Sequence, residues 1–144
     1  MGAATTTNNM CPRPRCGGRS ILVIEDEDEL RCLLSHILAA EGYQVQTVRT
    51  ARHALHVMRH HSFDVVLSDI SLPDVDGIEL IRQIASEFPH VSVIAMSGFM
   101  AAISPARLCF AGAAVLLQKP FPASQLLRSV SELHHRKSAS VARA

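Results

Sequence analysis

Short apolar runs alternate along this chain with segments of helical periodicity, and this alternation limits the possible folds more than any other feature. The clearest run, Val65-Val66-Leu67, contains two β-branched residues and ends in Ser68-Asp69. A short continuous apolar run is typical of a strand that is buried on both faces, as in a parallel sheet. Similar runs with helical segments between them predict an α/β protein built on a parallel sheet.

The same pattern gives the expected order of elements. The predicted strands cover residues 21–24, 43–48, 64–68, 91–96 and 114–118. The first helix is predicted from the acidic stretch after the first strand up to Gly42. Further helices are predicted over 50–60, 77–88 and 123–135, with a short or shifted helix within 99–110. This alternation suits a flavodoxin-like (βα)5 fold, a doubly wound five-stranded parallel sheet with strand order 2-1-3-4-5 and right-handed crossovers.

Length and charge narrow the organisation and the function class. The 144 residues suffice for one domain, which we expect over 20–135, between disordered tails at 1–19 and 136–144. A net charge of +1 argues against a nucleic-acid-binding protein. No apolar run is long enough to span a membrane, and residues 1–20 lack the apolar centre of a secretory signal, so we expect a cytoplasmic protein.

Reactive side chains follow four of the predicted strands. Glu25 and Asp26 follow the first, Asp69 the third, Ser97 the fourth and Lys119 the fifth. In open parallel sheets, ligands bind beyond the carboxyl ends of the strands. Clustered carboxylates repel one another unless a cation neutralises them, and Mg²⁺ suits a few carboxylates shared with phosphate. A lysine and a hydroxyl stabilise charge on a phosphoryl group, which an aspartate can accept as an acyl phosphate.

Four segments of the chain resemble the receiver domains of two-component response regulators, the CheY-like family, over about residues 20–135. These segments are Ile24-Glu25-Asp26-Glu27, then Ser68-Asp69 with the loop to Gly77, then Ala95-Met96-Ser97-Gly98, and finally Ala111-Gly112-Ala113 with Lys119-Pro120-Phe121. Because all four occur in order and at strand ends, the resemblance is highly specific. It implies a phosphorelay receiver in which Asp69 is the phosphoacceptor and Mg²⁺ is the cofactor.

The resemblance also assigns roles to the other site residues. It implies that Asp26 binds Mg²⁺ directly, together with Asp69, that Glu25 acts through water, and that Ser71 contributes its backbone carbonyl. Ser97 and Lys119 would bind the phosphoryl oxygens and transmit the switch. The Lys119–Pro120 peptide bond is expected to be cis, as is usual in the family.

Two positions depart from the family pattern. The family usually has an aromatic switch residue three positions before the lysine, where this chain has Leu116. Gly98 stands where an alanine is common, which widens the access beside Asp69. Phe99 and Ser71 occupy positions that influence dephosphorylation, and neither offers a carboxylate or amide to orient water. We therefore expect slow autodephosphorylation.

The expected partners are a histidine kinase or phosphotransfer protein, which supplies the phosphoryl group, and a downstream protein. The downstream contact is expected on the apolar stretch Phe99–Ile103 with the last strand and helix. Such a chain accepts and loses its own phosphoryl group and is not a turnover enzyme.

Three alternatives stay open at this point. The chain could be a phosphorylation-independent interaction module, as Leu116 favours, or a receiver fragment of a larger regulator or hybrid kinase. An aspartate-dependent phosphatase is disfavoured, because Ser71 stands where those enzymes carry a second aspartate. His53, His56 and His60 share a helical face, which we interpret as solvated and not as a metal site.

Overall fold

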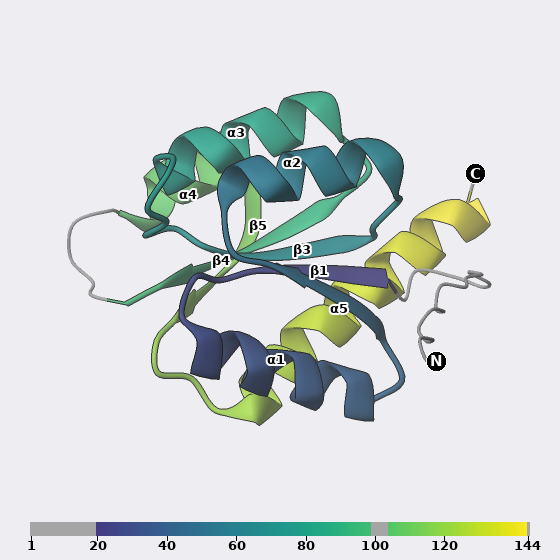
Figure 1. The fold of residues 1–144 in the computed structure, drawn as a ribbon. Coiled ribbons are helices and arrows are strands. Elements are labelled where there is room, and N and C mark those ends of the chain that lie inside the picture. Colours follow the sequence, from purple (N-terminus) through teal and green to yellow (C-terminus); the bar gives the residue numbers. More distant parts are fainter. Residues whose placement is uncertain (1–19, 99–103, 144) are drawn as a thin grey trace, which may run out of the picture.

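A five-stranded parallel sheet forms the centre of the protein (Figure 1). The computed structural model describes residues 20–98 and 104–143. The strands follow the order β2-β1-β3-β4-β5. Their bounds are Ser20–Ile24 (β1), Gln44–Val48 (β2), Val65–Asp69 (β3), Ser92–Ser97 (β4) and Ala113–Gln118 (β5). This arrangement confirms the predicted flavodoxin-like fold and its strand order.

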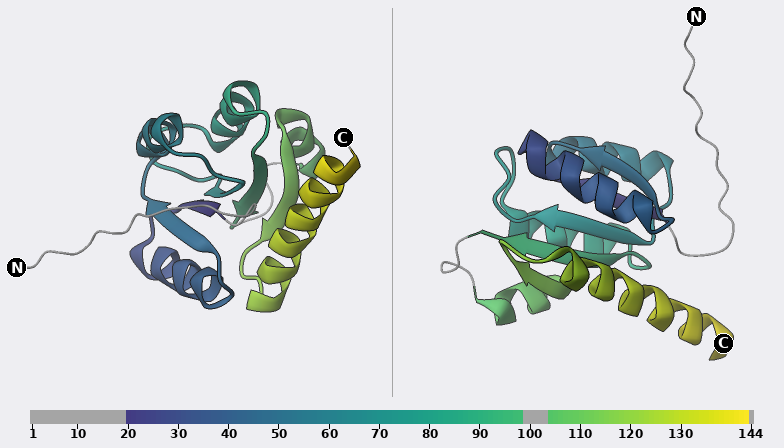
Figure 2. Two further views of the ribbon diagram at one scale, coloured as in Figure 1. Left: turned by 90° about the vertical axis from the view of Figure 1, so that its right-hand side faces the viewer. Right: turned by 90° about the horizontal axis from the view of Figure 1, so that it is seen from below.

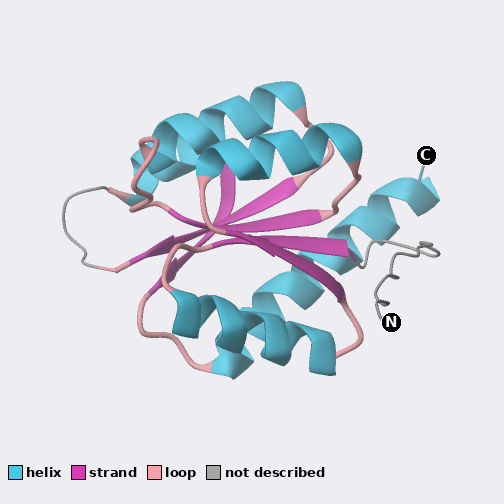
Figure 3. Cartoon of the chain, viewed as in Figure 1, coloured by secondary structure: helices cyan, strands magenta, loops and turns pink. Residues whose placement is uncertain are grey.

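Helices cover both faces of the sheet. They are α1 (Asp28–Ala40), α2 (Ala51–His60), α3 (Gly77–Glu87), α4 (Pro105–Ala111) and α5 (Ala123–Arg143). Helices α1 and α5 lie on one face, and α2, α3 and α4 lie on the other (Figures 1 and 3). The helix predicted to be short or shifted within 99–110 is the short α4, which begins at Pro105, because a proline is well accommodated in the first turn of a helix.

The two covered faces explain why the central strands contain unbroken apolar runs. Along β1, Ile21 and Val23 join the buried cluster beneath α1 and α5, whereas Leu22 and Ile24 join the cluster beneath α2, α3 and α4. Successive side chains of a strand point to opposite faces, so a strand covered on both sides needs apolar residues at every position. Burial on both faces fixes the position of β1 and β3, and therefore of the residues at their carboxyl ends.

Capping residues and one glycine set the ends of two helices. The Thr50 side chain caps α2 by accepting a hydrogen bond from the His53 N–H, and Asp76 caps α3 by accepting from the Ile78 N–H. Gly77 begins α3 against the β3 end, where an added Cβ would overlap the Cα and carbonyl atoms of Ile70. A glycine is therefore required there by the close approach of two backbone segments.

The structure corrects one expectation. Helix α5 continues to Arg143, so the segment from residue 136 that was predicted to be disordered is helical up to that point, and it extends beyond the rest of the domain (Figure 2). No proline or glycine follows His135 to end the helix. Within α1, Leu34 and Leu38 are buried, whereas Leu33 is 54% exposed although it fits the apolar spacing of the helix.

Other expectations concern segments outside the described ranges. They are the disordered tail predicted at 1–19 and the contact surface predicted at Phe99–Ile103. Within the described ranges, no helix has the length and apolarity needed to cross a membrane.

Candidate functional site: an acidic pocket at the carboxyl ends of the strands

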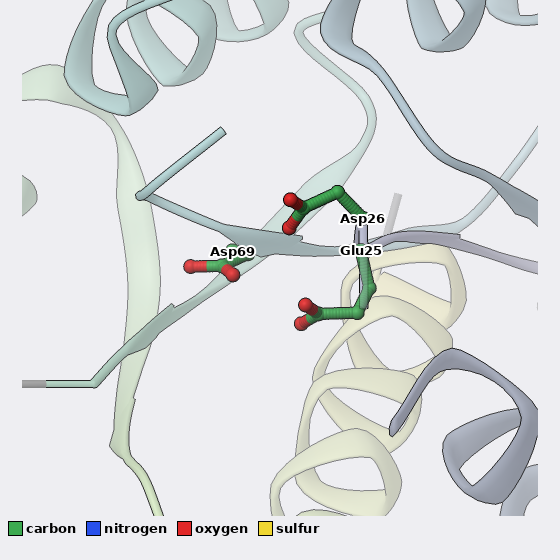
Figure 4. Close-up of side chains that lie close together, drawn as sticks. All are labelled: Glu25, Asp26 and Asp69. Atoms are coloured by element: carbon green, nitrogen blue, oxygen red, sulfur yellow. The ribbon is translucent and has the colours of Figure 1, made fainter. Parts of the chain in front are cut away.

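Three carboxylates meet beyond the ends of β1 and β3. Ile24 pairs with Ser68 across the two strands, so Glu25 and Asp26 follow one strand beside Asp69, the last residue of the other. One carboxylate oxygen from each residue lies within 4.8 Å of the others, and Figure 4 shows the three side chains gathered in one place. Asp26 is exposed, whereas the Glu25 side chain is only 1% exposed and that of Asp69 6%. The cluster, which we call the acidic pocket, therefore combines two buried carboxylates with one exposed carboxylate.

Lys119 joins two of these carboxylates. Its Nζ donates hydrogen bonds to Glu25 Oε1 and to Asp69 Oδ2, each at 3.1 Å. The Lys119 N–H also donates to the Ser97 carbonyl at 2.8 Å, which fixes the lysine backbone to the end of β4. Charges removed from water are costly unless they are paired, so this ammonium group is what allows two carboxylates to be buried side by side.

Backbone N–H groups complete the environment of the two buried carboxylates. The Ser71 N–H donates to Asp69 Oδ1 at 2.9 Å, while Oδ2 accepts from Lys119. The Glu27 N–H donates to Glu25 Oε2 at 3.2 Å. Both carboxylates are thereby held in one orientation, with each oxygen accepting at least one hydrogen bond.

The ionisation of the pocket follows from these contacts. Burial raises the pKa of Glu25, and the neighbouring Asp69 charge raises it further, although the Lys119 hydrogen bond acts in the opposite direction. For Lys119, burial acts to lower the pKa, but the hydrogen bonds to Asp69 and Glu25 outweigh it and the pKa is raised. The lysine is therefore firmly protonated at neutral pH.

The donor set fits a hard divalent cation. Carboxylate oxygens are the ligands that Mg²⁺ prefers, and one or two of them with several waters are enough to bind it. Asp26 and Asp69 could hold the ion, with the exposed Asp26 leaving room for water and a phosphate group. Among the described residues, this is the only group of three or more such side chains placed to hold a metal.

The remaining predicted site residues lie around this pocket. Ser97 is the half-buried last residue of β4, and the Lys119–Pro120 peptide bond is cis, as the resemblance implied. Leu116 pairs with Ala95 across β4 and β5 and packs against the cluster beneath α2, α3 and α4. An added Cβ at Gly98 would meet no atom within 4 Å, so the space beside the end of β4 is open.

Asp74, in the loop after β3, has two partners that the sequence did not reveal. Its carboxylate accepts hydrogen bonds from the Ala51 and Arg52 N–H groups at the start of α2. Partial burial acts to raise its pKa, but these backbone donors lower it below the ordinary value. No local motif signals a cap that is supplied from 23 residues away.

Comparisons with known proteins agree on one family. The model of the response regulator receiver domain matches residues 21–131. The chain is 35% identical over 111 residues to the response regulator protein FleR of Pseudomonas aeruginosa, covering 77% of this chain and 24% of FleR. It is 27% identical to the polar-differentiation response regulator DivK of Brucella ovis, covering 78% of this chain and 93% of DivK.

The solved structures give the same result. A CheY-like receiver domain protein from Methanospirillum hungatei superposes with a TM-score of 0.81 at 27% identity, covering 85% of this chain and 98% of that protein. The chain thus spans about a quarter of the length of FleR, and nearly all of DivK and of the archaeal receiver.

Proposed function

This chain belongs to the family of response regulator receiver domains, and on that premise we propose that it accepts a phosphoryl group on Asp69 in an Mg²⁺-dependent reaction. The observation that carries the proposal is the hydrogen bonding of the Lys119 ammonium group to Asp69 and Glu25, beside the exposed Asp26. A cation already placed at a carboxylate offsets the charge that a phosphoryl group brings.

The chemistry assigned to each residue follows from its contacts. A carboxylate oxygen of Asp69 attacks phosphorus, an O–P bond forms, and the bond from phosphorus to the donor nitrogen of a phosphohistidine breaks, with its electron pair leaving on the imidazole. Lys119, which donates to Asp69 Oδ2, would pair with the phosphoryl oxygens, and the Ser71 N–H, which donates to Asp69 Oδ1, would hold that oxygen in position. Bound Mg²⁺ would neutralise the charge shared by the carboxylates and the phosphoryl group.

Partners form part of the same proposal. Receiver domains of two-component systems interact with histidine kinases or phosphotransfer proteins, and one of these would supply the phosphoryl group here. A downstream protein would bind near α4, β5 and α5. Phe110 of α4 supports this surface because it is a large apolar side chain that is 91% exposed. We place the receiver in the cytoplasm and expect it to act stoichiometrically, as a phosphoacceptor and not as a turnover enzyme.

Two alternatives have specific support. Leu116 stands in place of the usual aromatic residue, which favours a module whose binding does not depend on phosphorylation. Because the match covers only 24% of FleR, a receiver of this kind can also be part of a longer regulator.

Intact-protein mass after incubation with acetyl phosphate, with and without Mg²⁺, tests the proposal. Wild-type protein should gain one phosphoryl group only when Mg²⁺ is present, and the Asp69→Asn variant should gain none. If wild type stays unmodified even when a histidine kinase is supplied, the phosphorylation-independent module becomes the better account.

A further inference from the structure

The loop between β3 and α3 is attached to a second helix at some distance from the acidic pocket. Asp74 Oδ1 accepts a hydrogen bond from the Ala51 N–H at 3.1 Å, and Oδ2 accepts from the Arg52 N–H at 3.0 Å. The first N–H groups of a helix have no partner within that helix, and a carboxylate is also favoured there by the helix dipole. Two charge-assisted hydrogen bonds therefore join this loop to the start of α2.

The base of the same loop is attached to the pocket. Ser71 and Asp76 form an antiparallel bridge, which closes the segment between them into a loop that contains Asp74. The Ser71 N–H donates to Asp69 Oδ1 at 2.9 Å, and Asp76 accepts from the Ile78 N–H at 3.0 Å. A constraint at Asp74 can therefore restrict Ser71, and through it the backbone beside the phosphoacceptor.

We propose that Asp74 is a positioning residue for the acidic pocket, holding the loop on α2 so that the Ser71 backbone is ordered before Mg²⁺ binds. The inference rests on the proposed function and on the role that the family resemblance implies for the Ser71 carbonyl, that of an Mg²⁺ ligand. Without the two hydrogen bonds, the loop would have to be ordered during binding, and that lost preorganisation would weaken the affinity. Asp74 itself does not touch the metal or the phosphoryl group.

The simpler role for Asp74 is to stabilise α2 alone, and the chain offers a control for that role. Thr50 Oγ1 accepts a hydrogen bond from the His53 N–H at 3.1 Å, so Thr50→Ala also removes a cap of α2 but leaves the loop untouched. Glu87→Ala removes a different carboxylate that joins α3 to α2, through Arg59 at 3.1 Å. If Asp74 acts through the loop, neither control should reproduce its effect on the pocket.

The experiment is a titration of the full chain with Mg²⁺ alone. Binding is measured by calorimetry, and the amide NMR signals of Asp69 and Ser71 are recorded during the titration. We expect Asp74→Ala to weaken Mg²⁺ binding about three- to tenfold. This is less than the loss of about 10- to 100-fold that is typical when a residue that hydrogen-bonds directly to a metal ligand is removed. Asp74→Asn should recover part of the affinity because one carbonyl oxygen remains. Thr50→Ala and Glu87→Ala should stay within about twofold of wild type, and only the Asp74 variants should shift the Ser71 amide signal in the metal-free protein.

Two results would overturn the inference while leaving the proposed function in place. One is wild-type Mg²⁺ affinity in a folded Asp74→Ala protein, and the other is an equal loss in Thr50→Ala, which would make the effect one of α2 stability. A wild-type protein that binds no Mg²⁺ would instead contradict the proposed function, and this inference with it.

Discussion

Replacing Lys119 by methionine tests what holds two carboxylates side by side in the pocket. Methionine keeps much of the length of the side chain but removes the ammonium group that lies 3.1 Å from both Glu25 Oε1 and Asp69 Oδ2. Removing one partner of a fully buried charge pair typically costs about 3–5 kcal/mol, because the remaining charge is left unpaired. Lys119 is 20% exposed and water can partly replace it, so we expect a loss of about 2–3 kcal/mol in the free energy of unfolding at pH 7 without Mg²⁺.

The pH dependence of this loss has a defined sign. The pKa of Lys119 is raised above 10.5 in the folded protein, so the stability that its charge contributes is fully present below pH 10.5 and is lost as the pH rises through the folded pKa. The pKa of Glu25 is raised above 4.5, and removing Lys119 raises it further. The variant should therefore approach wild-type stability as the pH falls towards 4.5 and Glu25 becomes protonated.

Urea unfolding followed by far-UV circular dichroism measures the difference, with Arg59→Met as the matched control. Arg59 also pairs with a carboxylate, Glu87, but that pair is largely exposed and should contribute less than about 1 kcal/mol. Added Mg²⁺ should restore part of the stability of Lys119→Met by neutralising the unpaired carboxylates. If the two variants were equally stable at pH 7 without Mg²⁺, the lysine would not be what permits burial of the pocket.

Four further substitutions test other parts of the account by urea unfolding, one of them also by pull-down. Gly77→Ala should destabilise the protein by about 2 kcal/mol or more, because the new methyl group overlaps the Ile70 backbone. Gly98→Ala is the control and should change stability by less than about 0.5 kcal/mol. Equal losses in the two variants would refute the packing argument. Thr50→Ala should cost about 1 kcal/mol through the lost cap of α2, and no loss would show that other groups satisfy that helix end. Phe110→Asp should leave stability within about 0.5 kcal/mol but weaken pull-down of a downstream protein by the phosphorylated receiver; unchanged capture would remove Phe110 from the binding surface.

The alternation of short apolar runs with helical segments was sufficient to predict the sheet, because the runs Ile21–Ile24 of β1 and Val65–Leu67 of β3 are covered on both faces. The same patterns placed Glu25, Asp26 and Asp69 at strand ends, and a parallel sheet brings such ends together. The role of each of these residues, by contrast, came from the family resemblance. Their chemical roles stay predictions that the experiments above address.

Features that depend on long-range packing could not be predicted from the sequence. Leu33 matches the apolar spacing of α1 but is exposed, since the width of the covered face depends on what packs against the helix. The contact of Asp74 with α2 joins segments 22 and 23 residues apart, and no motif announces it. Helix α5 continues past His135, and no proline or glycine follows that residue. The polar composition of the last residues suggested disorder, so the absence of a helix-breaking residue was not used to extend the predicted helix.

The most direct test of the central claim is to locate the phosphoryl group on the chain. Protein treated with acetyl phosphate and Mg²⁺ is reduced with borohydride, which converts an aspartyl phosphate into homoserine, and its peptides are then sequenced by mass spectrometry. The account predicts homoserine at Asp69 alone, in a reaction that requires Mg²⁺. Homoserine at Asp26 or at any other carboxylate, with Asp69 unchanged, would contradict it.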